Sequence, residues 1–230
     1  FMENPDYEPS MFVDSNQAKE LVDNNTVVVV VDTNKPSYTE CQDLLYLTRT
    51  IVVLDHHRRG SEVIQNAVLS YVEPYASSRC EMIAEILQYF ADGLKLRSIE
   101  ADCIYAGILI DTNNFVNSTG VRTFEAAAFL RRCGADITLV RKLFRDDMES
   151  YRAKAEIISS AEVYHNKFAI ARGVDLHIES PTIIGAQAAN ELLDISEIKA
   201  SFVLTEYNGR IYVSARSIDE VNVQIIMERL

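Results

Sequence analysis

The residues best suited to chemistry are three aspartates that each end an apolar segment, and two histidines that follow one of them. Asp32 comes after five valines, Asp55 comes after Ile-Val-Val-Leu and precedes His56 and His57, and Asp111 ends a longer apolar run. Acids at the carboxyl ends of strands in an open α/β sheet line one crevice, so we expect these side chains to converge. Converging carboxylates repel one another, and carboxylates with an imidazole suit divalent metals such as Mn²⁺ or Mg²⁺. Any one aspartate is explained equally well as a turn or cap residue, but the adjacent histidines favour a metal site.

The apolar segments around these residues predict an α/β arrangement in the first half of the chain. β-branched runs without alternation, such as 27–31 and 51–54, are typical of strands buried on both faces of a parallel sheet. A capping box at Ser37 and Glu40 predicts a helix to about residue 48 between the two strands, which gives a βαβ unit. Further helices are predicted from Ser78 to about 90, over 99–110, from 123 to a cap at Gly134, and from Asp136 to 144.

The residue pattern changes after residue 150, where apolar and polar residues alternate along the predicted strands and the predicted turns are short. Hairpins are predicted over 163–171 and over 202–215, where Asn208-Gly209 is a strong turn signal. A helix is predicted over 183–193, and Ser217 with Glu220 is expected to cap a last helix. We therefore expect an α/β domain with a parallel sheet flanked by helices, followed by a smaller α+β domain.

Composition excludes several classes of protein. The 230 residues include 34 acidic and 22 basic side chains, a formal net charge of −12, so long nucleic acids and anionic membranes are poor partners. The four cysteines form no CxxC pair, which excludes a zinc ribbon and fits reduced thiols in the cytoplasm. No apolar run approaches the roughly 20 residues that span a bilayer, so we expect no membrane contact by this chain itself.

Short motifs follow one another along nearly the whole chain, and their order is more specific than any one of them. Together they resemble the motifs of the DHH–DHHA1 phosphoesterases and, within that superfamily, the catalytic region of the GdpP-type cyclic-di-AMP phosphodiesterases. The motifs are VDTNKP at 31–36, LDHHRRG at 54–60, EPYASS at 73–78, GILIDT at 107–112, SARS at 214–217 and VNVQ at 221–224.

The resemblance implies a DHH domain over 1–147, a linker helix over 148–160 and a substrate-binding DHHA1 domain over 161–230. Two motifs of the family, a His-x-x-Pro-Asp-x-Asp run and a Gly-Gly-Gly-His run, do not occur in the sequence. We expect both domains to lack a terminal part for that reason. The resemblance also implies a homodimer, and a cytoplasmic catalytic portion of a membrane-anchored protein.

Roles for individual residues follow from the same resemblance. Asp32 would bridge two Mn²⁺ ions, with Mg²⁺ or Co²⁺ as other possibilities, and His56 and Asp111 would ligate one of them. Asp55 would orient His56, and His57 would act on the substrate phosphate. The residues expected to bind the substrate are Ser77, Ser214, Arg216, Ser217 and Asn222.

The activity implied is hydrolysis of cyclic-di-AMP to linear 5′-pApA by two-metal in-line attack. A nanoRNase-type hydrolase of short oligonucleotides such as pApA would share the fold and the metals. A cyclic-dinucleotide sensor that binds without turnover is an alternative of another class. Two roles are compatible with each of three further residues. Arg58 and Arg59 either contact a phosphate or lie in a solvated loop, and Tyr75 either stacks on a base or packs in the core.

Overall fold

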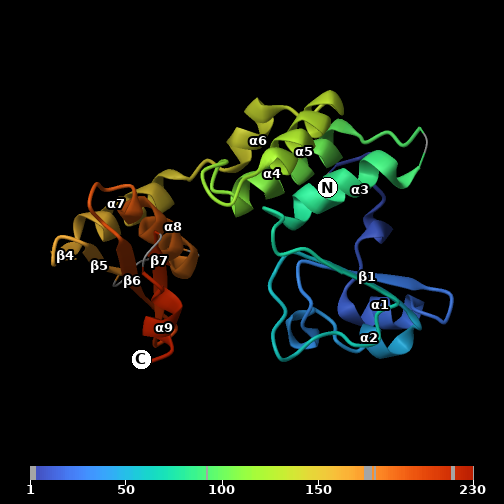
Figure 1. Cartoon of the computed structure of the whole chain (residues 1–230), viewed down its shortest axis with the longest axis horizontal. Coiled ribbons are helices and arrows are strands. Elements are labelled where there is room, and N and C mark those ends of the chain that lie inside the picture. Colours follow the sequence, from blue (N-terminus) through green and yellow to red (C-terminus); the bar gives the residue numbers. More distant parts are fainter. Residues whose placement is uncertain (1–3, 92, 174–177, 179, 219–220, 230) are drawn as a thin grey trace. The chain divides into compact units, whose positions relative to one another are not determined.

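The computed structural model describes residues 4–91, 93–173, 178, 180–218 and 221–229 (Figure 1). It divides into two compact units, Phe1–Phe144 and Arg145–Leu230. None of the helices within these described ranges combines the length and the apolar character that crossing a bilayer requires.

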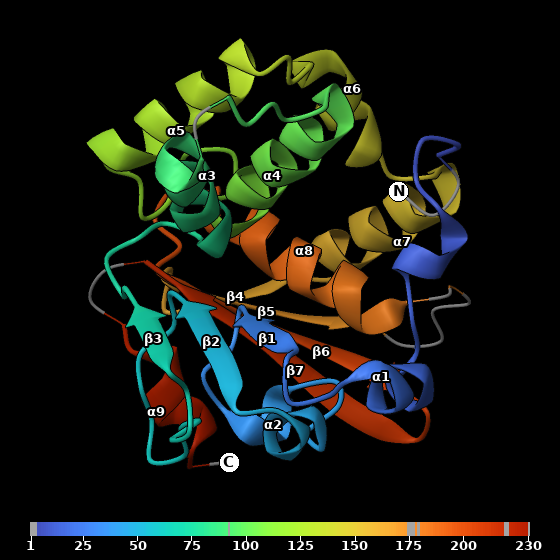
Figure 2. The same cartoon turned by 90° about the vertical axis from the view of Figure 1, so that its right-hand side faces the viewer.

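The first unit is built on a parallel sheet of β1 (Val27–Val31), β2 (Thr50–Asp55) and β3 (Leu69–Val72), in the order β1-β2-β3. The first two strands confirm the predicted βαβ pattern, and β3 was not predicted. The arrowheads of β2 and β3 point toward α3 (Arg79–Phe90; Figure 2), so the carboxyl ends of the strands face the helical part of this unit. This is the end of the sheet where a ligand is expected.

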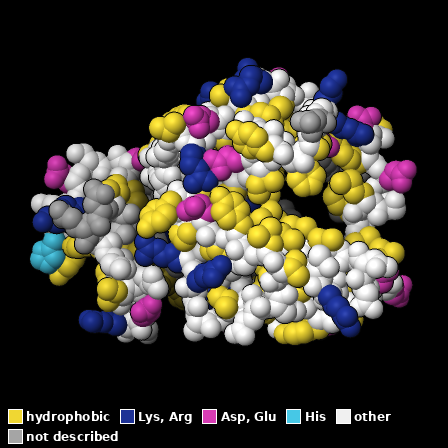
Figure 3. Space-filling model, turned by 45° about the vertical axis from the view of Figure 1, so that its right-hand side comes forward, with side chains coloured by type: hydrophobic (Ala, Val, Ile, Leu, Met, Phe, Trp, Pro, Cys, Tyr) yellow, Lys and Arg dark blue, Asp and Glu magenta, His cyan; other side chains and the backbone are white. Residues whose placement is uncertain are grey.

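The environment of β1 differs from the prediction of a strand buried on both faces. Only Val30 is buried, whereas Val27, Val29 and Val31 are exposed. Among the described residues β1 pairs with β2 alone, so it is an edge strand with one uncovered face. Figure 3 shows hydrophobic side chains, in yellow, gathered around an opening in the right-hand part of the view. The prediction holds better for β2, which is largely buried.

The segment between β1 and β2 is less helical than predicted. Instead of one helix it forms a 3₁₀ turn, η2 (Pro36–Tyr38), and a short helix, α2 (Leu44–Leu47). The expected capping box does not form, because the Ser37 hydroxyl and backbone N–H both donate to Glu62. A side chain distant in sequence has replaced the local partner, Glu40.

Helices α3 to α6 of the first unit pack around one apolar core, in which Ile108, Leu130 and Val140 are fully buried, whereas Leu45 of α2 lies in a second core with the sheet. Ser78 caps α3 by accepting from the Glu81 N–H, and Gly134 ends α5 with a φ of 103°, as the sequence predicted. The remaining elements are η1 (Pro9–Met11), α1 (Ser15–Leu21), α3 (Arg79–Phe90), α4 (Ser98–Asp111), α5 (Val121–Arg132) and α6 (Ile137–Leu143).

The second unit holds a mixed sheet in the order β4-β5-β6-β7, in which only β5 and β6 are parallel. Both predicted hairpins are confirmed, and in the second of them Asn208 and Gly209 have φ values of 51° and 69°. The elements are α7 (Met148–Ser159), β4 (Glu162–Tyr164), β5 (Phe168–Gly173), α8 (Pro181–Leu193), β6 (Ala200–Tyr207), β7 (Arg210–Ser217) and α9 (Val223–Met227).

Two details of the second unit refine the sequence analysis. The helix α7 contributes the fully buried Ile157 to the apolar core of this unit. The last helix, α9, is capped by Asn222, whose side chain accepts from the Ile225 N–H. The expected cap Ser217 instead ends β7, and its expected partner Glu220 lies outside the described residues.

Candidate metal centre

The predicted donors come from the ends of three elements of the first unit. Asp32 follows β1, His56 follows β2, and Asp111 is the last residue of α4. The structure brings them together: His56 Nε2 lies 3.6 Å from Asp32 Oδ1 and 4.0 Å from Asp111 Oδ2. Parallel pairing of β1 and β2 places their carboxyl ends at one sheet edge, and the end of α4 meets that edge.

The donor set fits a divalent cation. One donor atom each from Asp32, His56 and His57 lies within 4.8 Å of the other two. An ion bound at about 2.1 Å in octahedral geometry separates neighbouring ligand atoms by about 3 Å and opposite ones by about 4 Å. Two kinds of ligand, carboxylate oxygen and imidazole nitrogen, match Mn²⁺, Mg²⁺ or similar ions. His57, to which the sequence analysis gave a role on the substrate, therefore also belongs to the donor cluster.

Asp32 occupies an unusual backbone position. Its N–H still donates to Leu54 O at 3.1 Å, which continues the ladder between β1 and β2, but its φ is 67°. A non-glycine residue in this left-handed region is uncommon and is concentrated at functional sites. The backbone reverses there and turns the carboxylate toward His56.

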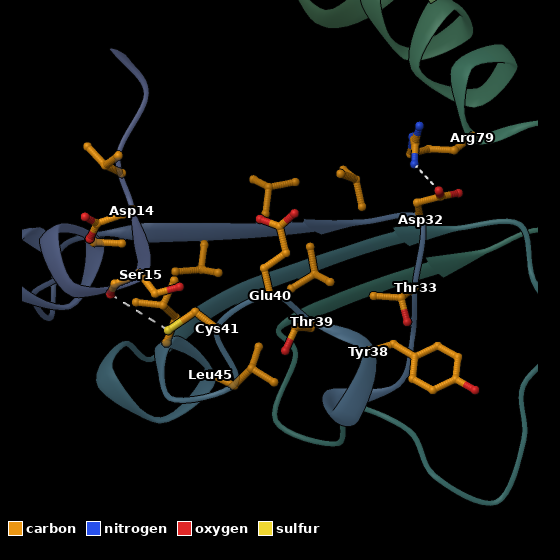
Figure 4. Close-up of a pocket in the computed structure, with 17 residues that line it drawn as sticks. Asp14, Ser15, Asp32, Thr33, Tyr38, Thr39, Glu40, Cys41, Leu45 and Arg79 are labelled. Atoms are coloured by element: carbon orange, nitrogen blue, oxygen red, sulfur yellow. Dashed lines mark hydrogen bonds and ion pairs between the residues drawn. The ribbon is translucent and has the colours of Figure 1, made fainter. Parts of the chain in front are cut away.

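A guanidinium neutralises Asp32. Arg79, the first residue of α3, places Nη1 2.7 Å from Asp32 Oδ2 (Figure 4). The pKa of Arg79 is raised: partial burial lowers it, but the neighbouring Cys80 and the Asp32 carboxylate outweigh that effect. The pair stands at one end of a pocket of about 950 Å³ that runs along β1.

Asp55 holds His57 and not, as the resemblance implied, the ring of His56. The fully buried carboxylate lies 2.8 Å from His57 Nδ1, and it accepts from the backbone N–H groups of His56 and His57 and from the Asn34 amide. Burial alone would raise the pKa of Asp55, but these hydrogen bonds lower it below its usual value. The tight turn after β2 brings both N–H groups to the same oxygen, and this geometry selects the second histidine.

Asp111 is the donor whose charge is least compensated. Burial raises its pKa; the His56 ring acts in the opposite direction, and the Asp32 carboxylate adds to the rise. It also ends α4, where the helix dipole disfavours negative charge. A cation between Asp111 and Asp32 would remove this repulsion.

A buried carboxylate behind the site fixes the segment that carries Arg79. Glu81 accepts hydrogen bonds from the Ser77 hydroxyl and N–H and from the Thr123 hydroxyl of α5. Ser77 is only 4% exposed. Its hydroxyl is buried and already donates to Glu81, and the substrate contact expected for Ser77 stays a prediction. In this structure Ser77 positions the loop that leads into α3.

The other residues expected to bind substrate lie in the second unit. Ser214 and Arg216 share one face of β7, because side chains alternate along a strand, and Ser217 points to the other face. Arg216 Nε donates to Asn190 Oδ1 on α8 at 2.9 Å. Asn222 caps α9.

Three residues of the site that the sequence did not predict are Asn34, Arg79 and Glu81. Asn34 is buried, donates to Asp55, and has an Oδ1 atom without a hydrogen-bond partner among the described residues. Each lies within or beside a motif already singled out, VDTNKP or EPYASS, and this adjacency was the available signal.

The chain is similar to known proteins over most of its length. The chain is 45% identical over 215 residues to the cyclic-di-AMP phosphodiesterase GdpP of Geobacillus thermodenitrificans, covering 93% of this chain and 32% of that protein. It is 43% identical over 223 residues to the GdpP of Bacillus subtilis, covering 96% and 34%. The chain thus spans about a third of the length of these relatives.

The fold and the family follow from two further matches. The crystal structure of an exopolyphosphatase-related protein from Bacteroides fragilis superimposes with a TM-score of 0.77 at 22% identity, over 89% of this chain and 62% of the other, which confirms the fold class. Residues 5–108 match the DHH family, N-terminal domain. This match contains Asp32, His56 and His57 of the donor cluster, and the matched part of the chain, residues 5–108, belongs to the DHH family.

Proposed function

We propose that this chain is the catalytic part of a metal-dependent phosphodiesterase that hydrolyses cyclic-di-AMP to linear 5′-pApA. The observation that carries the proposal is the meeting of Asp32, His56, His57 and Asp111 at the carboxyl edge of the sheet. The naming of the relatives as cyclic-di-AMP phosphodiesterases indicates the substrate.

Asp32, His56 and Asp111 are the residues that we propose to hold Mn²⁺. When bound, such an ion acidifies a water molecule and draws negative charge from the phosphate oxygens. In the absence of the ion, Arg79 supplies the positive charge that Asp32 needs. The overall negative charge of the chain makes this local positive charge important for an anionic substrate.

His57 is proposed to act on the phosphate or on the leaving 3′ oxygen. Its Nδ1 faces the buried Asp55 carboxylate, which leaves Nε2 as its second nitrogen for an outside partner. A carboxylate on one ring nitrogen orients the ring, so Nε2 is the nitrogen that can exchange a proton with the departing oxygen. Asp55 is thus a positioning residue for His57.

The activity is tested by incubating the chain with cyclic-di-AMP and Mn²⁺ and separating 5′-pApA by chromatography. We expect turnover that a chelator abolishes, and an Asp32→Asn variant that folds but has lost it. Metal-dependent turnover of pApA faster than that of cyclic-di-AMP would instead identify the nanoRNase-type activity. Saturable binding of cyclic-di-AMP without turnover by the complete protein would identify a sensor.

The second unit is proposed to hold the part of the substrate that is not cleaved. Arg216, with Ser214, Ser217 and Asn222 near it in sequence, offers hydrogen-bond donors for a phosphate or sugar. We expect Arg216→Ala to raise KM more than it changes kcat. Arg210→Ala, at the other end of β7, is the matched control that should leave KM unchanged.

The ion, the assembly and the cellular location belong to the same proposal. We expect Mn²⁺ to support higher turnover than Mg²⁺ or Co²⁺, which parallel titrations of the metal-free chain will measure. We also propose a homodimer, which sedimentation tests. The resemblance to the GdpP-type enzymes supports a cytoplasmic catalytic portion of a membrane-anchored protein, which fractionation of cells that express the complete protein tests.

A further inference from the structure

A second pocket of the first unit contains none of the candidate metal donors. Its volume is about 430 Å³. It joins parts of two motifs that are separate in the sequence, since two arginines come from LDHHRRG and a proline and a tyrosine come from EPYASS. The lining residues are Arg58, Arg59, Val72, Pro74 and Tyr75.

The pocket is adjacent to the candidate metal centre through the sheet. Val72, the last residue of β3, is the ladder partner of Asp55. The N–H of Glu73 donates to the backbone oxygen of Asp55 at 2.9 Å, which holds the loop that follows β3 against the end of β2. The pocket therefore lies beside the end of β2, from which His56 and His57 of the candidate metal centre follow.

The two arginines of the pocket are available for an anion. Both are exposed, and no carboxylate of the described residues lies within ion-pair distance of either guanidinium. Arg59 is directed toward β3, because its Nη2 donates to Ser70 Oγ at 3.1 Å. In a chain of net charge −12, two adjacent guanidiniums reverse the charge locally, and their planar forks match phosphate oxygens.

The tyrosine of the pocket offers a flat surface beside these charges. Tyr75 is 92% exposed, and its backbone N–H donates to the Glu73 carboxylate at 3.3 Å, so the loop is held while the ring stays uncovered. Exposed aromatic rings beside basic side chains bind single nucleotides by stacking on the base.

We propose that the pocket of Arg58, Arg59 and Tyr75 binds one nucleotide of the dinucleotide, with its phosphate on the arginines and its base on the tyrosine ring. The choice of a nucleotide as ligand rests on the proposed function. The binding itself requires no metal, since none of the three residues belongs to the donor cluster.

The chain contains no tryptophan, so Tyr75→Trp places a single fluorescent reporter in the pocket. With the 230-residue chain in a chelating buffer, where hydrolysis is blocked, we expect 5′-pApA to quench this fluorescence saturably. Arg58→Ala and Arg59→Ala in the same background should each weaken binding about five- to tenfold, the usual scale for loss of one charge-assisted contact. Arg49→Ala removes an exposed charge elsewhere in the first unit and should change nothing.

Three results would refute the proposal that this pocket binds a nucleotide. The first is equal quenching of a reporter at Tyr46→Trp, on the exposed surface of α2, because it would show unspecific stacking. The second is equal affinity of the wild-type chain and of Tyr75→Ala for 5′-pApA by calorimetry. The third is that neither the wild-type chain nor Tyr75→Ala binds 5′-pApA. Each is distinguishable from failure of the proposed function, which is read separately as loss of Mn²⁺-dependent turnover.

Discussion

Replacing Arg79 by alanine should raise the affinity of the chain for Mn²⁺. The guanidinium lies 2.7 Å from Asp32 Oδ2, so its positive charge competes with a metal ion for the same carboxylate. Two unit charges at 4 Å attract by about 4 kcal/mol at an effective dielectric constant of 20, whereas exposed ion pairs contribute about 1 kcal/mol or less. The side chain of Asp32 is 46% exposed and that of Arg79 is 24% exposed, which places this pair between the two cases. A net of about 1–2 kcal/mol corresponds to an affinity about 5- to 30-fold higher.

Calorimetric titration of Mn²⁺ into the metal-free chain measures this change without any turnover. Arg79→Lys keeps the charge but loses the planar fork, so its affinity should lie between those of the wild type and of Arg79→Ala. Arg49→Ala is the control for a general loss of positive charge. An unchanged or lower affinity in Arg79→Ala would refute the reasoning, because it would show that Arg79 orients Asp32 for the metal rather than competing with it.

Three further predictions concern the histidines, the buried aspartate and a helix contact. His56→Ala should weaken Mn²⁺ binding about 10- to 100-fold or more, with partial rescue of activity by excess metal. His57→Ala should lower kcat about 10²- to 10⁴-fold while the metal content stays normal. Equal losses of bound metal in both variants would show that His57 is a metal ligand. The pKa of Asp55 is lowered in the folded chain, so its stabilising contribution is present at neutral pH and is lost as the pH falls below about 4. The urea midpoint of Asp55→Asn should therefore fall less in acid than that of the wild type. Plots of urea midpoint against pH that run parallel for the two proteins would contradict this. Gly107→Ala should lower the free energy of unfolding by about 1–3 kcal/mol, because a methyl group there would overlap Cys80 Sγ. In a double-mutant cycle, Cys80→Ala should restore part of this loss. If the two changes in the free energy of unfolding simply add, the contact is excluded.

Features that depend on neighbours in sequence were predictable. The run of valines predicted β1, and Asn208-Gly209 predicted the turn between β6 and β7, because both are local preferences of the backbone. The capping box at Ser37 failed because Glu62, 25 residues away, is the hydrogen-bond partner that the fold provides. The prediction that β1 is buried on both faces was wrong because an edge strand can have the same composition as a central strand.

The candidate site shows the same division. The convergence of Asp32 and Asp111 followed from their places at the ends of apolar segments. The partner of Asp55 did not follow, because the choice between two adjacent imidazoles depends on the angle of a single turn. Arg79 and Glu81 were not identified because their roles depend on contacts with other elements, and the sequence shows only that both start a helix.

The left-handed backbone at Asp32 sets folding stability against function at a single residue. Aspartate tolerates this conformation less well than glycine and no better than asparagine, and its carboxylate lies among others of the same charge. Glycine at this position would relieve the backbone strain and the repulsion from Asp111, but it would also lose the ion pair with Arg79 and the proposed ligand. Where the relief of strain exceeds the loss of that ion pair, selection of random variants for heat resistance alone enriches Asp32→Gly, so an engineer who wants a robust catalyst must screen for turnover in the same step.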